Sequence, residues 1–210
     1  MIVIRTTNLE PFTDPASPRW ARTDTTAVEL VPAPLGLQPN DYIIVSWEHR
    51  SYGEVAALNV SAVHDGARIA VRLNWKKVRP DTGAGEGFAD SVALAFPVRG
   101  VPLITEMGNP DAPIHALQWL ARKNEIRSVS AMGIGTSLDA AQVGEAAFAG
   151  WSQGAWTVVL VRDLSGPEGT AILEPGTSTQ ISFAVWDGGN QERAGIKAVS
   201  ADWAEFELEP

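Results

Sequence analysis

Residues 62–75 read AVHDGARIAVRLNW, and this stretch decides the fold class. At its centre lies Asp65-Gly66, a residue pair typical of a type I′ hairpin turn, in which both central residues need positive φ. After the turn, the apolar side chains at positions 69, 71, 73 and 75 alternate with mostly polar ones at positions 68 to 74. This period of two predicts an antiparallel strand with one buried face and one solvated face.

The same pattern extends along the chain, where short runs rich in Val and Ile are separated by clusters of Gly, Pro, Asp and Asn. One segment, Ser137–Phe148, begins with a Ser N-cap and predicts a short helix interrupted by Gly144. No repeat or linker divides the sequence, so we expect one all-β domain over residues 1–210. This domain would be an antiparallel β-sandwich with a few short helices in loops, and its ligand would be held at a loop-bearing edge. The predicted strands are Ile2–Thr7, Ala27–Pro32, Tyr42–Glu48, Glu54–Val63, Arg68–Val78, Ser91–Pro97, His115–Ala121, Ala155–Asp163, Thr179–Trp186 and Ala204–Glu209.

The bulk composition narrows the range of partners. A net charge of −9 and a pI near 4.8 argue against nucleic acid or an anionic membrane, because phosphate binding needs a basic face. The absence of cysteine removes disulfides, thiolate metal sites and Fe–S ligation, and it fits an oxidising compartment. The sequence contains no signal-peptide pattern and no apolar run of membrane-spanning length, so we expect no membrane partner.

Motifs for catalysis are weak. The histidines His49, His64 and His115 lack metal-ligand spacing. We expect a surface role for His49 and for His64, which lies in a hairpin turn, and a core role for His115. The glycine-rich segments Gly83–Gly87 and Gly133–Ser137 resemble phosphate loops only faintly, because neither leads from a buried strand into a strong helix. No Gly-x-Ser-x-Gly elbow occurs either. The sequence therefore favours a protein without catalytic chemistry of its own.

Two features indicate cofactor chemistry instead. Met107 lies directly before a Pro-rich loop, where a thioether can act as a soft axial ligand to haem iron, although a methionine in a core is usually packing material. The C-terminal block Phe183–Ser200 runs from a strand into a turn dense in glycine and charge. This block places Lys197 between apolar neighbours, although taken alone Lys197 has the pattern of a surface lysine.

Together these residues carry a resemblance. The sequence EMG at 106–108, PI at 113–114 and Trp119, with the block FAVWDGGNQERAGIK at 183–197, resembles the haem b-binding gamma subunits of periplasmic molybdoenzymes. These include ethylbenzene dehydrogenase, dimethylsulfide dehydrogenase, selenate reductase and chlorate reductase. The ethylbenzene dehydrogenase branch is the most similar, with Asp187 as a departure. The resemblance covers nearly the whole chain, because residues 62–66, 69–75, 90–97 and 156–160 look like the family's strands in the same order.

The resemblance implies a β-sandwich that holds one non-covalent haem b, with Met107 and Lys197 as axial ligands to the metal. The absence of a Cys-x-x-Cys-His motif agrees that any haem is not covalently attached. Two protein ligands would leave no open position on the iron, which suits an electron carrier. Arg193 or Lys123 could contact a propionate, and His115 is the alternative ligand. The expected walls of the haem pocket are Trp119, Phe96 and Trp186.

The resemblance also implies a larger complex. We expect a molybdenum-containing catalytic alpha subunit, an Fe–S beta subunit and a soluble c-type cytochrome or other carrier, between which this chain passes electrons. The expected location is the periplasm, reached together with a partner that carries a signal. Three alternatives stay open: a stand-alone b-type cytochrome, an iron-free β-sandwich that binds carbohydrate or another small molecule, and an uncharacterised enzyme.

Overall fold

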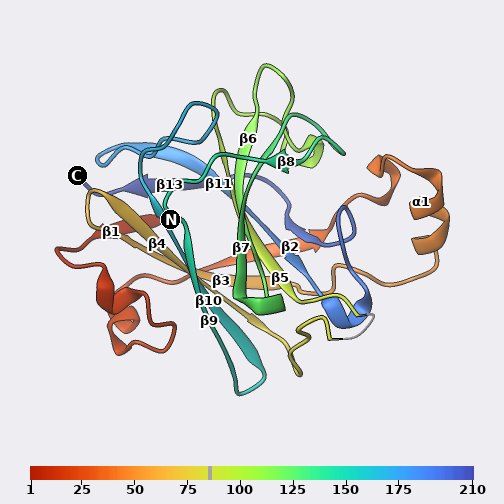
Figure 1. The fold of residues 1–210 in the computed structure, drawn as a ribbon, viewed down its shortest axis with the longest axis horizontal. Coiled ribbons are helices and arrows are strands. Elements are labelled where there is room, and N and C mark those ends of the chain that lie inside the picture. Colours follow the sequence, from red (N-terminus) through yellow and green to blue (C-terminus); the bar gives the residue numbers. More distant parts are fainter. Residues whose placement is uncertain (85–86) are drawn as a thin grey trace.

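The structure is a computed structural model that describes residues 1–84 and 87–210. Its strands pack as a mostly antiparallel β-sandwich, as the sequence predicts (Figure 1). One layer has the strand order β8-β7-β6-β5-β11-β12 and the other has the order β2-β3-β4-β10-β9. Strand β2 pairs with both β12 and β3 and so connects the two layers. The strands are β1 (Ile2–Arg5), β2 (Thr26–Pro32), β3 (Ala57–His64), β4 (Arg68–Lys76), β5 (Ser91–Pro97), β6 (Ile114–Leu120), β7 (Glu125–Ala131), β8 (Leu138–Asp139), β9 (Ala146–Ser152), β10 (Ala155–Asp163), β11 (Ser178–Trp186), β12 (Ala198–Ser200) and β13 (Ala204–Leu208).

The predicted strand at Tyr42–Glu48 is wrong, because this segment forms the helix α1 (Asp41–Trp47), which stands to one side of the sandwich in Figure 1. The β-branched residues of the segment favour a strand, but the Asn40 side chain caps the helix by accepting a hydrogen bond from the Tyr42 N–H at 2.7 Å. Short 3-10 helices occupy several loops. They are η1 (Glu10–Phe12), η2 (Pro18–Arg22), η3 (Leu35–Leu37), η4 (Ile104–Glu106), η5 (Arg122–Asn124) and η6 (Gly188–Asn190).

The predicted helix at Ser137–Phe148 is also wrong. The segment contains β8, an extended connection and the start of β9. Gly144 has a φ of +64°, outside the range of a right-handed helix, and it packs against the Asp163 carboxylate, so a regular helix does not form here. Of the other predictions, nine strands are confirmed within a few residues, whereas β7, β8, β9 and β12 were not predicted as strands. Residues 85 and 86 of the glycine-rich segment Gly83–Gly87 lie outside the described residues.

The β3–β4 hairpin is confirmed, but its turn differs from type I′. Gly66 has a φ of +88°, whereas Asp65 has no positive φ. Instead, the Asp65 carboxylate accepts hydrogen bonds from the N–H groups of Ala67 and Arg68 at 2.9 and 2.7 Å. The side chain of Asp65 thus stabilises the turn that the dipeptide was expected to form by backbone conformation alone.

The main core lies between the two layers and contains three indoles in contact. The ring centroid of Trp119 lies 6.3 Å from that of Trp75 and 5.1 Å from that of Trp156. A smaller core covers the outer face of β4, where Ala70 is buried under the N-terminal residues 9–20. This face is therefore less solvated than the alternation predicts. Among the described residues, no helix has the length and apolarity to cross a membrane.

Candidate functional site

A cavity of about 810 Å³ lies over the outer face of the layer that contains β5, β6 and β11. Side chains alternate between the two faces of a strand, and on this face several of them are small: Ala93 and Ala95 of β5, Ala116 of β6, and Ser182 and Ala184 of β11. Small side chains leave room above the sheet. The volume is within the range of about 300–1,000 Å³ typical of small-molecule and cofactor sites. Loops that leave the edges of the layer form the opposite wall, at residues 33–43, 104–107, 134–139 and 192–197.

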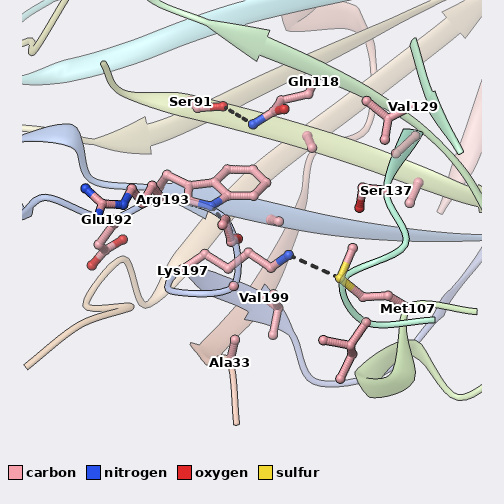
Figure 2. Close-up of a pocket in the computed structure, with 18 of the residues that line it drawn as sticks. Ala33, Ser91, Met107, Gln118, Val129, Ser137, Glu192, Arg193, Lys197 and Val199 are labelled. Atoms are coloured by element: carbon pink, nitrogen blue, oxygen red, sulfur yellow. Dashed lines mark hydrogen bonds between the residues drawn. The ribbon is translucent and has the colours of Figure 1, made fainter. Parts of the chain in front are cut away.

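Met107 and Lys197 meet inside this cavity, although they are 90 residues apart in the chain. The Lys197 Nζ lies 3.6 Å from the Met107 Sδ. Figure 2 shows the two side chains pointing toward one another, with a dashed line between the nitrogen and the sulfur. Met107 ends η4 in the left-handed conformation, with a φ of 56°. Gly108 follows with a φ of +85°, and a Cβ there would lie 2.9 Å from a backbone oxygen of β7, so the loop passes close to the strand. Two consecutive left-handed residues direct the thioether into the cavity.

Lys197 lies just before β12 and is only 7% exposed. No carboxylate forms an ion pair with it among the described residues, and its Nζ lies 5.0 Å from the centre of the Trp186 ring. Burial lowers the pKa of Lys197 from 10.5 to about 8, because the charged amine loses its solvation. The amine therefore loses its proton more easily than an ordinary lysine. Once it has lost its proton, the amine beside the thioether makes a nitrogen and sulfur donor pair that suits a soft transition metal.

The aromatic residues predicted as pocket walls divide into two groups. Trp186 lines the cavity, and its indole N–H donates a hydrogen bond to the Ala194 carbonyl at 3.0 Å. Phe96 and Trp119 do not line it, because their positions on β5 and β6 point toward the core between the layers. The Trp119 indole N–H instead donates to the Asn124 side chain at 2.6 Å. The structure therefore places these two side chains in the core and not in the wall of this cavity, because side chains alternate between the two faces of a strand.

His115, the alternative ligand, also faces the core. Its Nε2 lies 2.9 Å from the Ser128 hydroxyl and its Nδ1 lies 3.3 Å from the Arg162 guanidinium. Burial and the charge of Arg162 lower the pKa of His115 from 6.5 to about 4. His115 is therefore a satisfied core histidine.

The two residues predicted as possible propionate contacts lie in different places. Arg193 lies at the cavity with its guanidinium 4.5 Å from the Phe88 ring centre, whereas Lys123 does not line the cavity.

The sequence analysis missed two parts of this site. One is the floor of small side chains, for which the alternating alanines of β5 were a signal that went unused. The other is Glu192, a cavity residue that is only 2% exposed. Nothing in the local sequence distinguishes this glutamate from the surface carboxylates of an acidic protein, so only the structure identifies it.

The sequence of this chain is similar to a known protein family and to several named proteins. The family model described as Ethylbenzene dehydrogenase matches residues 137–198, a segment that contains Lys197. Chlorate reductase subunit gamma of Ideonella dechloratans is 34% identical over 204 residues, covering 90% of this chain and 78% of that protein. Dimethylsulfide dehydrogenase subunit gamma of Rhodovulum sulfidophilum is 27% identical over 217 residues, covering 100% and 78%. A Haloferax mediterranei protein named as a respiratory nitrate reductase heme subunit is 29% identical over 201 residues, covering 93% and 68%.

Solved structures resemble the chain at the level of the fold. A family 9 carbohydrate binding module of Caldicellulosiruptor kristjanssonii in complex with glucose superimposes with a TM-score of 0.59 at 10% identity, covering 100% of this chain and 95% of that one. Its complex with cellotriose gives a TM-score of 0.53 at 10% identity, covering 100% and 93%. At this identity the likeness shows the β-sandwich fold alone.

Proposed function

Because this chain belongs to the gamma-subunit family that includes chlorate reductase subunit gamma, we propose that it is a non-catalytic electron-transfer subunit that binds one non-covalent haem b. The observation that carries this proposal is the Met107–Lys197 pair, a thioether and a buried amine 3.6 Å apart inside a cavity of about 810 Å³. The haem would supply one-electron exchange. Met107 and Lys197 would be its axial ligands, and Trp186 would form part of its wall.

The residues present fit such a group. The cavity has the volume of a cofactor site, its floor is made of small side chains, and its two donor atoms already face one another, so a small separation would admit a metal between them. Lys197 has no carboxylate partner that would hold its proton, and its burial favours the neutral form that can bind a metal. With both axial positions taken by the protein, substrate and oxygen would have no access to the iron, which suits electron transfer.

The family places such subunits in oxidoreductase complexes. We therefore propose that the partners are a molybdenum-containing alpha subunit and an Fe–S beta subunit, with a soluble c-type cytochrome or other carrier as the external electron partner. We also propose a periplasmic location. Fractionation of cells that express the protein tests this location, since protein found only in the cytoplasm would refute it.

Visible absorption spectra of the haem-loaded protein test the ligand pair, in the oxidised and the dithionite-reduced state. We expect sharp low-spin b-type bands in the wild type and in the control Met132→Ala, which removes an exposed methionine. Met107→Ala and Lys197→Ala should each become high-spin or lose the haem, because each variant removes one axial ligand. Unchanged spectra in these two variants would place the ligands elsewhere. No haem uptake by the wild type would sink the proposal and favour an iron-free binding module.

A further inference from the structure

Glu192 is a buried carboxylate that forms no ion pair among the described residues. Such a group is costly to bury unless hydrogen-bond donors replace its water. Its Oε1 accepts hydrogen bonds from the Gly53 N–H at 2.8 Å and the Asn190 side-chain amide at 3.1 Å, and its Oε2 accepts from the Asp187 N–H at 2.9 Å. Both oxygens are therefore held by N–H donors. A glutamine cannot reproduce this arrangement, because its NH₂ group would face an N–H group.

The hydrogen bond to Gly53 connects Glu192 to a segment that contacts the backbone of Lys197. Gly53 has a φ of +63°, and a Cβ there would lie 2.7 Å from the Pro32 Cα and 2.9 Å from the Lys197 carbonyl oxygen. The same carbonyl oxygen accepts a hydrogen bond from the Ala33 N–H at 2.9 Å. Glu192 thus fixes the segment that packs directly against the Lys197 peptide group. The position of this peptide group decides where the lysine side chain begins its path into the cavity.

The hydrogen bond to Asp187 connects Glu192, through the Asp187 side chain, to the opposite layer of the sandwich. The Asp187 carboxylate lies 2.6 Å from the Nζ of Lys77, which directly follows β4. The same ammonium group contacts Asp81 at 2.7 Å and the buried Asp90 at 3.1 Å. The turn that begins at Asp187 is therefore tied to both layers, and Glu192 connects this anchored turn to the Gly53 segment.

We propose that Glu192 is a positioning residue for Lys197. By joining the Asp187 turn to Gly53, it fixes the Lys197 backbone so that the amine points at the Met107 sulfur. The inference rests on the proposed function, because it concerns the ligand pair of the proposed haem site. Its geometric content belongs to the haem-free chain, in which the amine and the sulfur already lie 3.6 Å apart.

The first experiment uses the full haem-free chain, so its result does not depend on haem. Reductive methylation with formaldehyde and a borohydride, followed by mass spectrometry, measures the rate at which Lys197 is modified. We expect Lys197 of Glu192→Gln to react about tenfold faster than in the wild type, the increase in local opening expected from one lost hydrogen bond to a charged group. The matched control is Glu145→Gln, since Glu145 also accepts from a backbone N–H, at 2.6 Å, but does not line the cavity.

The second experiment reads the spectrum of the haem-loaded protein, which a merely structural role would not change. A displaced Lys197 leaves one axial position open, so we expect a high-spin fraction in Glu192→Gln that added imidazole converts to low-spin. The wild type and Glu145→Gln should not respond to imidazole. A folded Glu192→Gln variant with the wild-type labelling rate and no imidazole response would overturn the inference.

A third variant covers the case in which Glu192→Gln does not fold. Asn190→Ala removes one of the three donors to the carboxylate and should raise the labelling rate of Lys197 by about threefold, a fraction of the full effect. An unchanged rate in a folded Asn190→Ala variant would overturn the inference. Failure of the wild type to bind haem would refute the proposed function alone, because the labelling rates would still decide whether Glu192 positions Lys197.

Discussion

Replacing Lys197 by Met is expected to stabilise the haem-free protein, because it removes a buried amine. Lys197 is 7% exposed, and burial lowers its pKa from 10.5 to about 8. This difference corresponds to about 3 kcal/mol of unfavourable free energy for the charged amine at neutral pH. The contact with the Trp186 ring, at 5.0 Å, offsets about 0.5–1 kcal/mol of this cost. We therefore expect Lys197→Met to increase the free energy of unfolding by about 2–3 kcal/mol at pH 7.

The increase should depend on pH in a defined direction. Because the pKa of Lys197 is lower in the folded state than in the unfolded state, the unfolded chain binds more protons between pH 8 and 10.5. The wild type therefore gains stability as the pH rises through this window. Methionine does not titrate, so the advantage of the variant should be full below pH 8 and should decline toward pH 10.5.

Urea unfolding of the haem-free wild type and Lys197→Met at pH 7 and pH 10 measures both effects. The control is Lys76→Met, which removes an exposed lysine of β4 and should change stability by less than about 0.5 kcal/mol. The reasoning would be refuted if Lys197→Met were less stable than the wild type at pH 7. It would also be refuted if the difference between them were the same at both pH values.

Lowering the pH from 6.5 to 4 should reduce the free energy of unfolding by up to about 3 kcal/mol, because the pKa of His115 is lower in the folded chain and the unfolded chain therefore binds more protons in this window. In urea unfolding, the free energy of unfolding should depend on pH in the wild type and less so in His115→Gln. Gly108→Ala should cost about 2–3 kcal/mol, since the φ is +85° and the new Cβ would lie 2.9 Å from a backbone oxygen. Gly154→Ala, with a φ of +77° but nothing within 4 Å, should cost only about 1 kcal/mol, and equal losses in thermal unfolding would contradict the argument. Lys77→Met leaves three adjacent carboxylates without their cation and should lower the free energy of unfolding in urea by about 3–5 kcal/mol. A decrease no greater than that of Lys76→Met would show that this cluster contributes little to stability.

The local sequence determined most of the strands, because a period of two leaves a readable pattern wherever one face of a strand is buried. The local sequence did not predict the helix α1, because the β-branched residues at positions 43–45 favour a strand. One capping hydrogen bond from Asn40, together with burial of Trp47, was enough to select a helix there. It failed again at Ser137–Phe148, whose helix-forming residues are extended because Gly144 packs against Asp163. Short segments are decided by such tertiary contacts more than by intrinsic propensity.

For the site, the resemblance to the gamma-subunit family predicted Met107, Lys197 and Trp186, and the structure brings these three residues together at one cavity. The tertiary structure alone decided that the amine and the thioether lie 3.6 Å apart, that the amine is buried, and that Glu192 belongs to the same site. Phe96 and Trp119 were also predicted as pocket walls, whereas the structure places them on the core face of their strands. Alternation reveals that a strand has two faces, but when one face meets a core and the other an apolar cavity, both are apolar. Only the packing of the two layers determines which face is which.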